Sequence, residues 1–163
     1  MKMLFMDLAE ANRHINRTWL DGMAHLALAE LDRPQGAFFG SIFGTWNHIL
    51  VGDRIWMARI LNQPAPTDNL RERLCATMES FRPAREETDD GLIRLVAGMT
   101  DFAQDLVYRN TKGTRFQTPL YQVLAHLIAH QSHHRGQISQ MFHERKIPVP
   151  DGGLIDFFRN RPR

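Results

Sequence analysis

The length and composition of the chain are those of an ordinary globular protein. Its 163 residues are 43% hydrophobic and 23% charged, values far from those of disordered or fibrous proteins. Twenty basic and eighteen acidic residues leave a formal net charge of +2, too weak a field to predict a nucleic-acid partner. The apolar runs are too short to span a bilayer, and the single Cys75 excludes an internal disulfide or a cysteine zinc site. We therefore expect one cytoplasmic domain over residues 1–163, with no membrane partner.

Hydrophobic periodicity predicts helices over the first part of the chain. Apolar residues recur at helical spacing over residues 4–31, and the Arg-Pro-Gln-Gly sequence at 33–36 closes this stretch, which predicts one long helix. A second amphipathic helix is expected to begin near Gly40 or Ser41. It should end before the Asn-Gln-Pro-Ala-Pro sequence at 62–66.

The middle of the chain gives weaker signals. A third helical stretch lies between residues 69 and 105, where Pro83 predicts either a break or a fresh helix start. Two short segments, 106–109 and 114–117, flank a polar turn at 110–113 that contains a glycine. This pattern predicts a small extended hairpin.

The last predicted helix has the clearest boundaries. Thr118 is expected to cap it, Pro119 to occupy its first helical position, and the apolar pattern continues to Phe142. The Lys-Ile-Pro-Val-Pro sequence at 146–150 then stops it. The sequence therefore predicts an all-α fold: a four-helix bundle with a small extended hairpin before the last helix.

Four of the eight histidines fall within nine residues of this last helix. At 100° per residue, His134 lies about 50° from the centre of the apolar face and His130 about 90°, whereas His126 and His133 lie beyond about 130°. The inward pair is spaced i, i+4, which is how a helix offers two ligands to one metal ion. The alternative is a hydrogen-bonded histidine pair at a bundle edge. An isolated HxxxH pattern more often indicates such a pair than a metal site.

Two further polar residues interrupt the same apolar face. Gln131 and Arg135 project about 10° and 50° from its centre, so one turn of the stripe is polar. Burial of such groups is costly unless they are satisfied. Helical bundles often place metal or ligand sites in an interior polar layer of this kind.

A third metal ligand should come from a facing helix. In the second helix, Asp53 lies within about 20° of the apolar centre, while His48 lies roughly 120° away, ordinarily a flanking position. The helical wheel alone favours Asp53 and leaves His48 open.

Three segments together resemble the DinB/YfiT-like metalloenzyme family, also called the DinB-like domain. They are Trp46-Asn-His48-Ile-Leu-Val-Gly-Asp53-Arg54-Ile-Trp56, His126-Leu-Ile-Ala-His130-Gln-Ser-His133-His134-Arg135-Gly136-Gln137 and Pro148-Val-Pro-Asp151-Gly-Gly-Leu-Ile-Asp156-Phe-Phe. The HHRGQ element is the most specific of these motifs.

The resemblance implies a four-helix bundle that binds one divalent metal, usually nickel or zinc, through three histidines, often as a homodimer. Matched residue by residue, the family's ligands fall on His48, His130 and His134. The resemblance thus favours His48 over Asp53 as the third ligand. Asp53, together with Gln131 and Arg135, would then line the pocket or support the ligands.

Three neutral imidazoles leave a coordination position open, which is typical of catalytic rather than structural metal sites. Relatives of this family include thiol-dependent transferases and isomerases, so the resemblance implies a small-molecule substrate and a possible low-molecular-weight thiol cofactor. S-transfer and hydrolysis by a metal-bound water both remain open, and no catalytic residue can be named. The alternative is a non-catalytic metal-binding stress-response module.

Overall fold

A computed structural model describes residues 1–161, and within this range the protein is mostly helical with one two-stranded hairpin. The elements are α1 (Lys2–Met23), α2 (Leu28–Leu31), α3 (Ile42–Ile60), α4 (Met78–Gly98), β1 (Asp105–Arg109), β2 (Arg115–Pro119), α5 (Leu120–Glu144) and α6 (Leu154–Asn160). The all-α class and the hairpin are confirmed. The described residues form six helices, however, rather than the four predicted.

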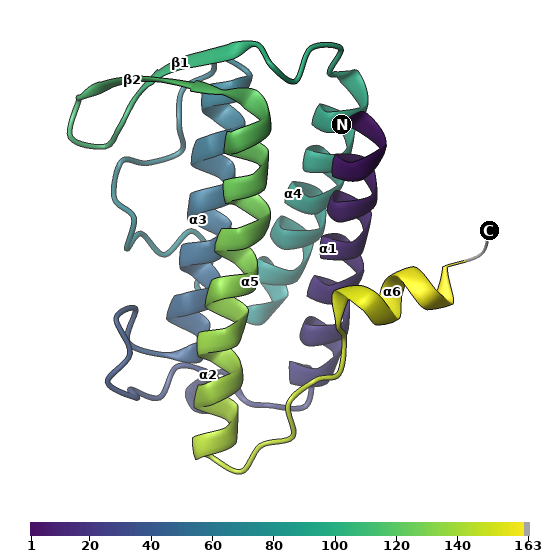
Figure 1. Ribbon diagram of the computed structural model, residues 1–163. Coiled ribbons are helices and arrows are strands. Elements are labelled where there is room, and N and C mark those ends of the chain that lie inside the picture. Colours follow the sequence, from purple (N-terminus) through teal and green to yellow (C-terminus); the bar gives the residue numbers. More distant parts are fainter. Residues whose placement is uncertain (162–163) are drawn as a thin grey trace.

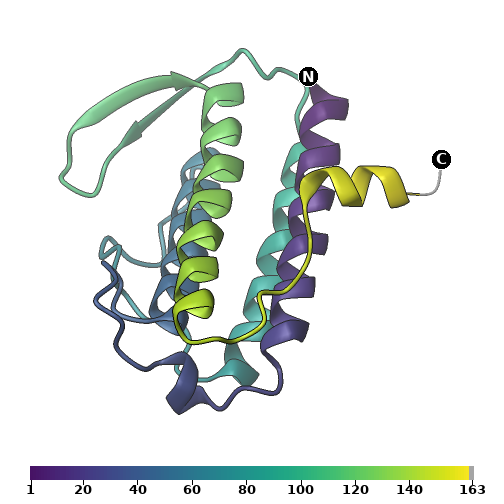
Figure 2. The same ribbon diagram turned by 60° about the horizontal axis from the view of Figure 1, so that its bottom comes forward.

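The four long helices lie side by side and form the body of the molecule (Figure 1). α1 packs mainly against α4, and α3 packs mainly against α5. In the turned view of Figure 2, these two helix pairs face each other. Apolar side chains from all four helices fill the interior, among them Leu20, Trp46, Phe81 and Phe142, each completely or almost completely buried.

The prediction of one helix over residues 4–31 is wrong, because the helix stops at Met23 and a separate turn, α2, begins at Leu28. The backbone N–H of Ala27 donates to the Glu30 carboxylate at 3.1 Å, which caps the new turn. Leu31 is completely buried. A straight continuation of α1 would carry Leu31 about 12 Å past Met23 along the helix axis, whereas the bend returns it to the core.

The second helix agrees closely with its prediction. The Ser41 hydroxyl accepts a hydrogen bond from the N–H of Gly44 at 2.9 Å, which caps α3. The break predicted at Pro83 is wrong, since α4 runs through this residue. Pro83 is exposed and lies near the start of the helix. The backbone hydrogen bond that the proline lacks is therefore lost where water can reach the freed carbonyl.

The hairpin pairs β1 with β2 antiparallel, from Asp105 opposite Pro119 to Arg109 opposite Arg115. Gly113, in the turn, has a φ of +82°, a conformation that glycine adopts without strain. The predicted cap at Thr118 and helical position of Pro119 are wrong, because the pairing keeps both in β2 and α5 begins at Leu120. Within residues 1–161, no helix is both long and apolar enough to cross a membrane.

Candidate metal centre

Three histidine side chains from two helices converge on one point. His48 comes from α3, and His130 and His134 come from α5. The Nε2 atom of His130 lies 3.1 Å from Nε2 of His48 and 3.1 Å from Nε2 of His134. One nitrogen from each ring lies within 4.8 Å of the other two, a cluster that could hold a metal ion.

The opposite ring nitrogens explain how two of these imidazoles are oriented. Nδ1 of His48 lies 2.9 Å from the carbonyl oxygen of Leu70, and Nδ1 of His134 lies 2.7 Å from Oε1 of Gln137. Both oxygens only accept hydrogen bonds, so each Nδ1 carries the proton and each Nε2 presents a lone pair. A proton on Nε2 of His130 could satisfy only one of these lone pairs. A cation would satisfy all three nitrogens, and the arrangement therefore fits a metal.

Burial keeps these imidazoles neutral. It lowers the pKa of His48 to about 4 and that of His130 to about 3, and it also lowers the pKa of His134. Neighbouring histidines lower the pKa of His130 further, because a second positive charge beside it is unfavourable. At neutral pH all three rings are neutral, which is the form that binds a metal.

His48 is more buried than its position on the helical wheel suggests, with 6% of its surface exposed. Two loops cover this flank of α3. The ring of Phe39 stacks on His48 at 3.6 Å between centroids and 13° between planes, and the loop after α3 supplies the carbonyl of Leu70. The wheel reports only direction around one helix and contains no information on covering loops.

Gly52 provides the space for His130. A Cβ atom at this position of α3 would lie 2.9 Å from Cε1 of the His130 ring. Sequence reasoning did not identify this glycine, although a glycine inside a long helix is a signal of close packing.

His126 and His133 point outward from α5 and are exposed, as their wheel positions predict. The ring of His126 lies 5.6 Å from that of His130. The amide nitrogen of Gln137 lies 3.1 Å from Nε2 of His133, while its oxygen binds His134. In the sequence, Gln137 stands out only as part of the HHRGQ element, and the structure shows that it hydrogen-bonds both His133 and His134.

Asp53, Gln131 and Arg135 are buried, as predicted from the wheel, but they lie in a polar layer between the helices. Oδ2 of Asp53 accepts hydrogen bonds from Arg85 at 2.6 Å and from Gln131 at 2.8 Å. Arg85 is therefore the ion-pair partner of Asp53. Within the described chain, the hydrogen bonds of these three residues join the helices and do not reach the histidine rings.

The other members of the layer were not identified from the sequence. Arg135 donates to the side-chain oxygens of Asn12 at 2.8 Å and Asn16 at 2.9 Å, and Asn16 in turn donates to Asp89 and Gln131. These asparagines lie at i, i+4 on α1, as Arg85 and Asp89 do on α4, and this spacing was the available signal.

The charges of the layer balance, because it contains two arginines, Arg85 and Arg135, and two aspartates, Asp53 and Asp89. Burial raises the pKa of Asp53 to about 6, although the Arg85 guanidinium opposes the shift. Among the described residues, three buried polar atoms of the layer have no hydrogen-bond partner: Asp53 Oδ1, Asn12 Nδ2 and Arg85 Nε. The layer thus links α1, α3, α4 and α5 behind the histidine cluster.

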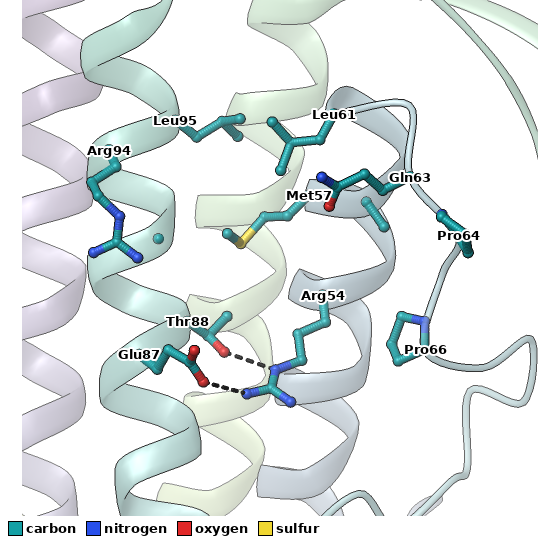
Figure 3. Close-up of a pocket in the computed structure, with 12 residues that line it drawn as sticks. Arg54, Met57, Leu61, Gln63, Pro64, Pro66, Glu87, Thr88, Arg94 and Leu95 are labelled. Atoms are coloured by element: carbon teal, nitrogen blue, oxygen red, sulfur yellow. Dashed lines mark hydrogen bonds and ion pairs between the residues drawn. The ribbon is translucent and has the colours of Figure 1, made fainter.

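A cavity of about 700 Å³ lies elsewhere, between α3 and α4 (Figure 3). Arg54 crosses it and donates to Thr88 at 2.9 Å, with Glu87 at 3.5 Å. None of the three converging histidines lines this cavity, so it is separate from the candidate metal centre.

The fold and the cluster define a helical protein with a three-histidine arrangement suited to metal binding. The DinB family model matches residues 1–145, and the chain belongs to the DinB family. This confirms the resemblance inferred from the motifs. A comparison with curated proteins found no match.

Proposed function

We propose that His48, His130 and His134 bind one divalent transition metal, nickel or zinc, and that the protein is a metal-dependent enzyme acting on a small molecule. The observation that carries the proposal is the convergence of three Nε2 atoms, two of which present lone pairs because their Nδ1 protons are held elsewhere. Membership in the DinB family supports the same site.

The chain prepares this centre through the groups around the imidazoles. The carbonyl of Leu70 and the amide of Gln137 fix the orientation of two rings. Phe39 covers one face of His48 and excludes water there. Burial keeps all three rings neutral without an added base.

Three protein ligands leave room for a further ligand on the metal. When bound, a divalent ion at such a site lowers the pKa of a coordinated water or thiol, which favours either hydrolysis or S-transfer. A soft thiolate is a good ligand for nickel or zinc. A low-molecular-weight thiol is therefore one proposed cosubstrate, and water is the other.

Cobalt substitution provides the test, because Co²⁺ bound to three histidines reports each added ligand in its visible spectrum. Addition of glutathione should produce a sulfur-to-metal charge-transfer band. The band should be absent in His48→Ala and retained in the matched control His133→Ala, whose side chain is exposed.

The outcomes separate the candidate functions. A spectrum unchanged at millimolar glutathione but perturbed by acetate or imidazole would favour the hydrolase over the S-transferase. A spectrum that no added ligand perturbs would contradict the enzyme proposal and favour a non-catalytic metal-binding module.

A further inference from the structure

A small cavity of about 340 Å³ lies between the end of α3 and the hairpin. Its lining includes Arg59, Arg109 and Arg115, together with the polar side chains of Tyr108, Asn62 and Gln63. Among residues 1–161, no acidic side chain lines it. We call this the arginine pocket, because three cations surround it without a lining carboxylate.

Two of these arginines face each other across the hairpin. Arg109 and Arg115 are directly paired in the antiparallel register. Like charges in this position destabilise a pair of strands, and a two-stranded hairpin has little stability to spare. Arg109 donates to the carbonyl of Gly113 at 2.7 Å, which satisfies one hydrogen bond but leaves its charge uncompensated.

Several other arginines of the chain form ion pairs, in contrast to those of the arginine pocket. Arg13, Arg73 and Arg82 each lie within 3 Å of an aspartate oxygen. Within residues 1–161, none of the three pocket arginines has a carboxylate oxygen within 4.0 Å. Among the described residues, the charge of the pocket therefore has no protein counterion.

Arg59 is half-buried and lies against two aromatic rings. Its guanidinium carbon lies 4.5 Å from the centre of the Trp56 ring and 5.2 Å from that of Tyr108. Burial lowers its pKa, which reflects the cost of holding this cation away from water. Cation–π contact with two rings favours this position of the guanidinium before a ligand arrives, which reduces the entropy lost on binding.

We infer that the arginine pocket binds the compact oxyanion, a carboxylate or a phosphate, at one end of a small organic molecule. Guanidinium groups match the geometry of both anions through paired N–H donors. The small volume and the weak net charge of the chain favour a small ligand over a polyanion.

A row of aromatic rings connects the pocket with the histidine cluster. Centroid distances are 4.9 Å from Tyr108 to Trp56, 5.5 Å from Trp56 to His126 and 5.6 Å from His126 to His130. Arg59 lies eleven positions after His48 in α3, about 16 Å along the axis. If the proposed function holds, the pocket binds the end of the substrate that is remote from the metal. Anion binding itself does not rest on that function.

The test is a titration of the protein with inorganic phosphate and with succinate at low ionic strength. Binding is monitored by tryptophan fluorescence, to which Trp56 contributes, and by thermal unfolding. Replacement of Arg59 or Arg115 by Gln should weaken binding of the preferred anion by about ten-fold or more, because each removes a charge-assisted hydrogen bond. Arg17→Gln, an exposed position on α1, is the matched control and should bind as the wild type does. The anion that binds more tightly shows whether the pocket prefers a phosphate or a carboxylate group.

A second measurement separates anion binding from a structural role. Without anion at low salt, Arg115→Gln should not lower Tm, because it removes a repulsion between paired strands. A lower Tm would assign Arg115 a structural role and contradict the inference. The inference would also be contradicted if Arg59→Gln and Arg115→Gln bound the anions as tightly as Arg17→Gln does. Binding of duplex DNA without binding of either small anion would contradict it too.

Metal content is measured in the same samples and should be unchanged by these arginine variants. A wild-type protein that contains metal but binds neither anion would overturn only the inference about the arginine pocket. Absence of metal with anion binding retained would overturn the proposed function alone.

Discussion

Gly52 allows α3 to lie close to the ring of His130. In Gly52→Ala, the added methyl group would lie 2.9 Å from Cε1 of His130, so the imidazole must move. We expect metal affinity to fall by at least about ten-fold, the lower end of the loss seen when the support of a ligand is removed. Competition with a chromophoric chelator measures this change.

The control for Gly52→Ala is Gly136→Ala in α5, where an added Cβ meets no atom within 4 Å. This second variant should be more stable by about 0.5–1 kcal/mol and should bind metal normally, because alanine is the better helix former. Equal metal affinity in the two variants would contradict the role given to Gly52.

Gln137 orients His134 through a hydrogen bond of 2.7 Å to Nδ1. Gln137→Ala should weaken metal binding by about 10- to 100-fold, because the ring loses both its orientation and its fixed tautomer. Gln140→Ala, three residues further along α5, removes only a hydrogen bond to Glu144 and should leave the affinity unchanged. Calorimetric titration with zinc compares the two.

The sequence predicted part of the histidine cluster at this scale. The directions of His130 and His134 follow from helix periodicity alone, and so does the exposure of His126 and His133. His48 required the family resemblance, because the groups that bury it come from distant loops. Tertiary packing of this kind leaves no periodic signal in the sequence.

At the scale of the elements, Arg85 connects α4 to α3 inside the polar layer. Its guanidinium binds Asp53 at 2.6 Å and Asp89 at 2.9 Å, and all three side chains are buried. Arg85→Met should destabilise the protein by about 3–5 kcal/mol, because two buried carboxylates lose their shared counterion. Urea unfolding measures the loss. A change below about 1 kcal/mol would show that the layer relaxes without Arg85.

The positions of the long helices could be predicted better than the way in which their polar residues pair. Asp53, Gln131 and Arg135 were correctly placed inside, but several helices offer partners for each of them. The pairing depends on the lateral order of α1, α3, α4 and α5, which one sequence does not specify. The break after Met23 was missed for a similar reason, since the pattern of apolar residues continues through the bend.

For the whole molecule, the metal-free protein should become less stable in acid. Its folded-state pKa values for His48 and His130, about 4 and about 3, lie below the unfolded value of 6.5. The unfolded chain therefore binds more protons, and the stability present above pH 6.5 is lost as the pH falls toward 4 and 3. The raised pKa values of the buried carboxyls Asp53 and Asp89 act in the opposite direction, but these are two groups against four histidines whose pKa values are lowered.

Thermal unfolding of the metal-free protein between pH 7.5 and 5 checks this dependence. Tm should decrease toward pH 5, and the decrease should be smaller in His130→Gln, which lacks one of the imidazoles with a lowered pKa. A Tm that rises on acidification of the wild type would contradict the sign derived from the histidines.

Metal analysis of the purified wild type and five alanine variants tests the central claim most directly. About one divalent transition metal per chain is expected in the wild type, little or none in His48→Ala, His130→Ala and His134→Ala, and nearly full content in His126→Ala and His133→Ala. The first three histidines present the converging nitrogens, whereas the other two are exposed on α5. A wild type without metal, or an equal loss in all five variants, would contradict the assignment.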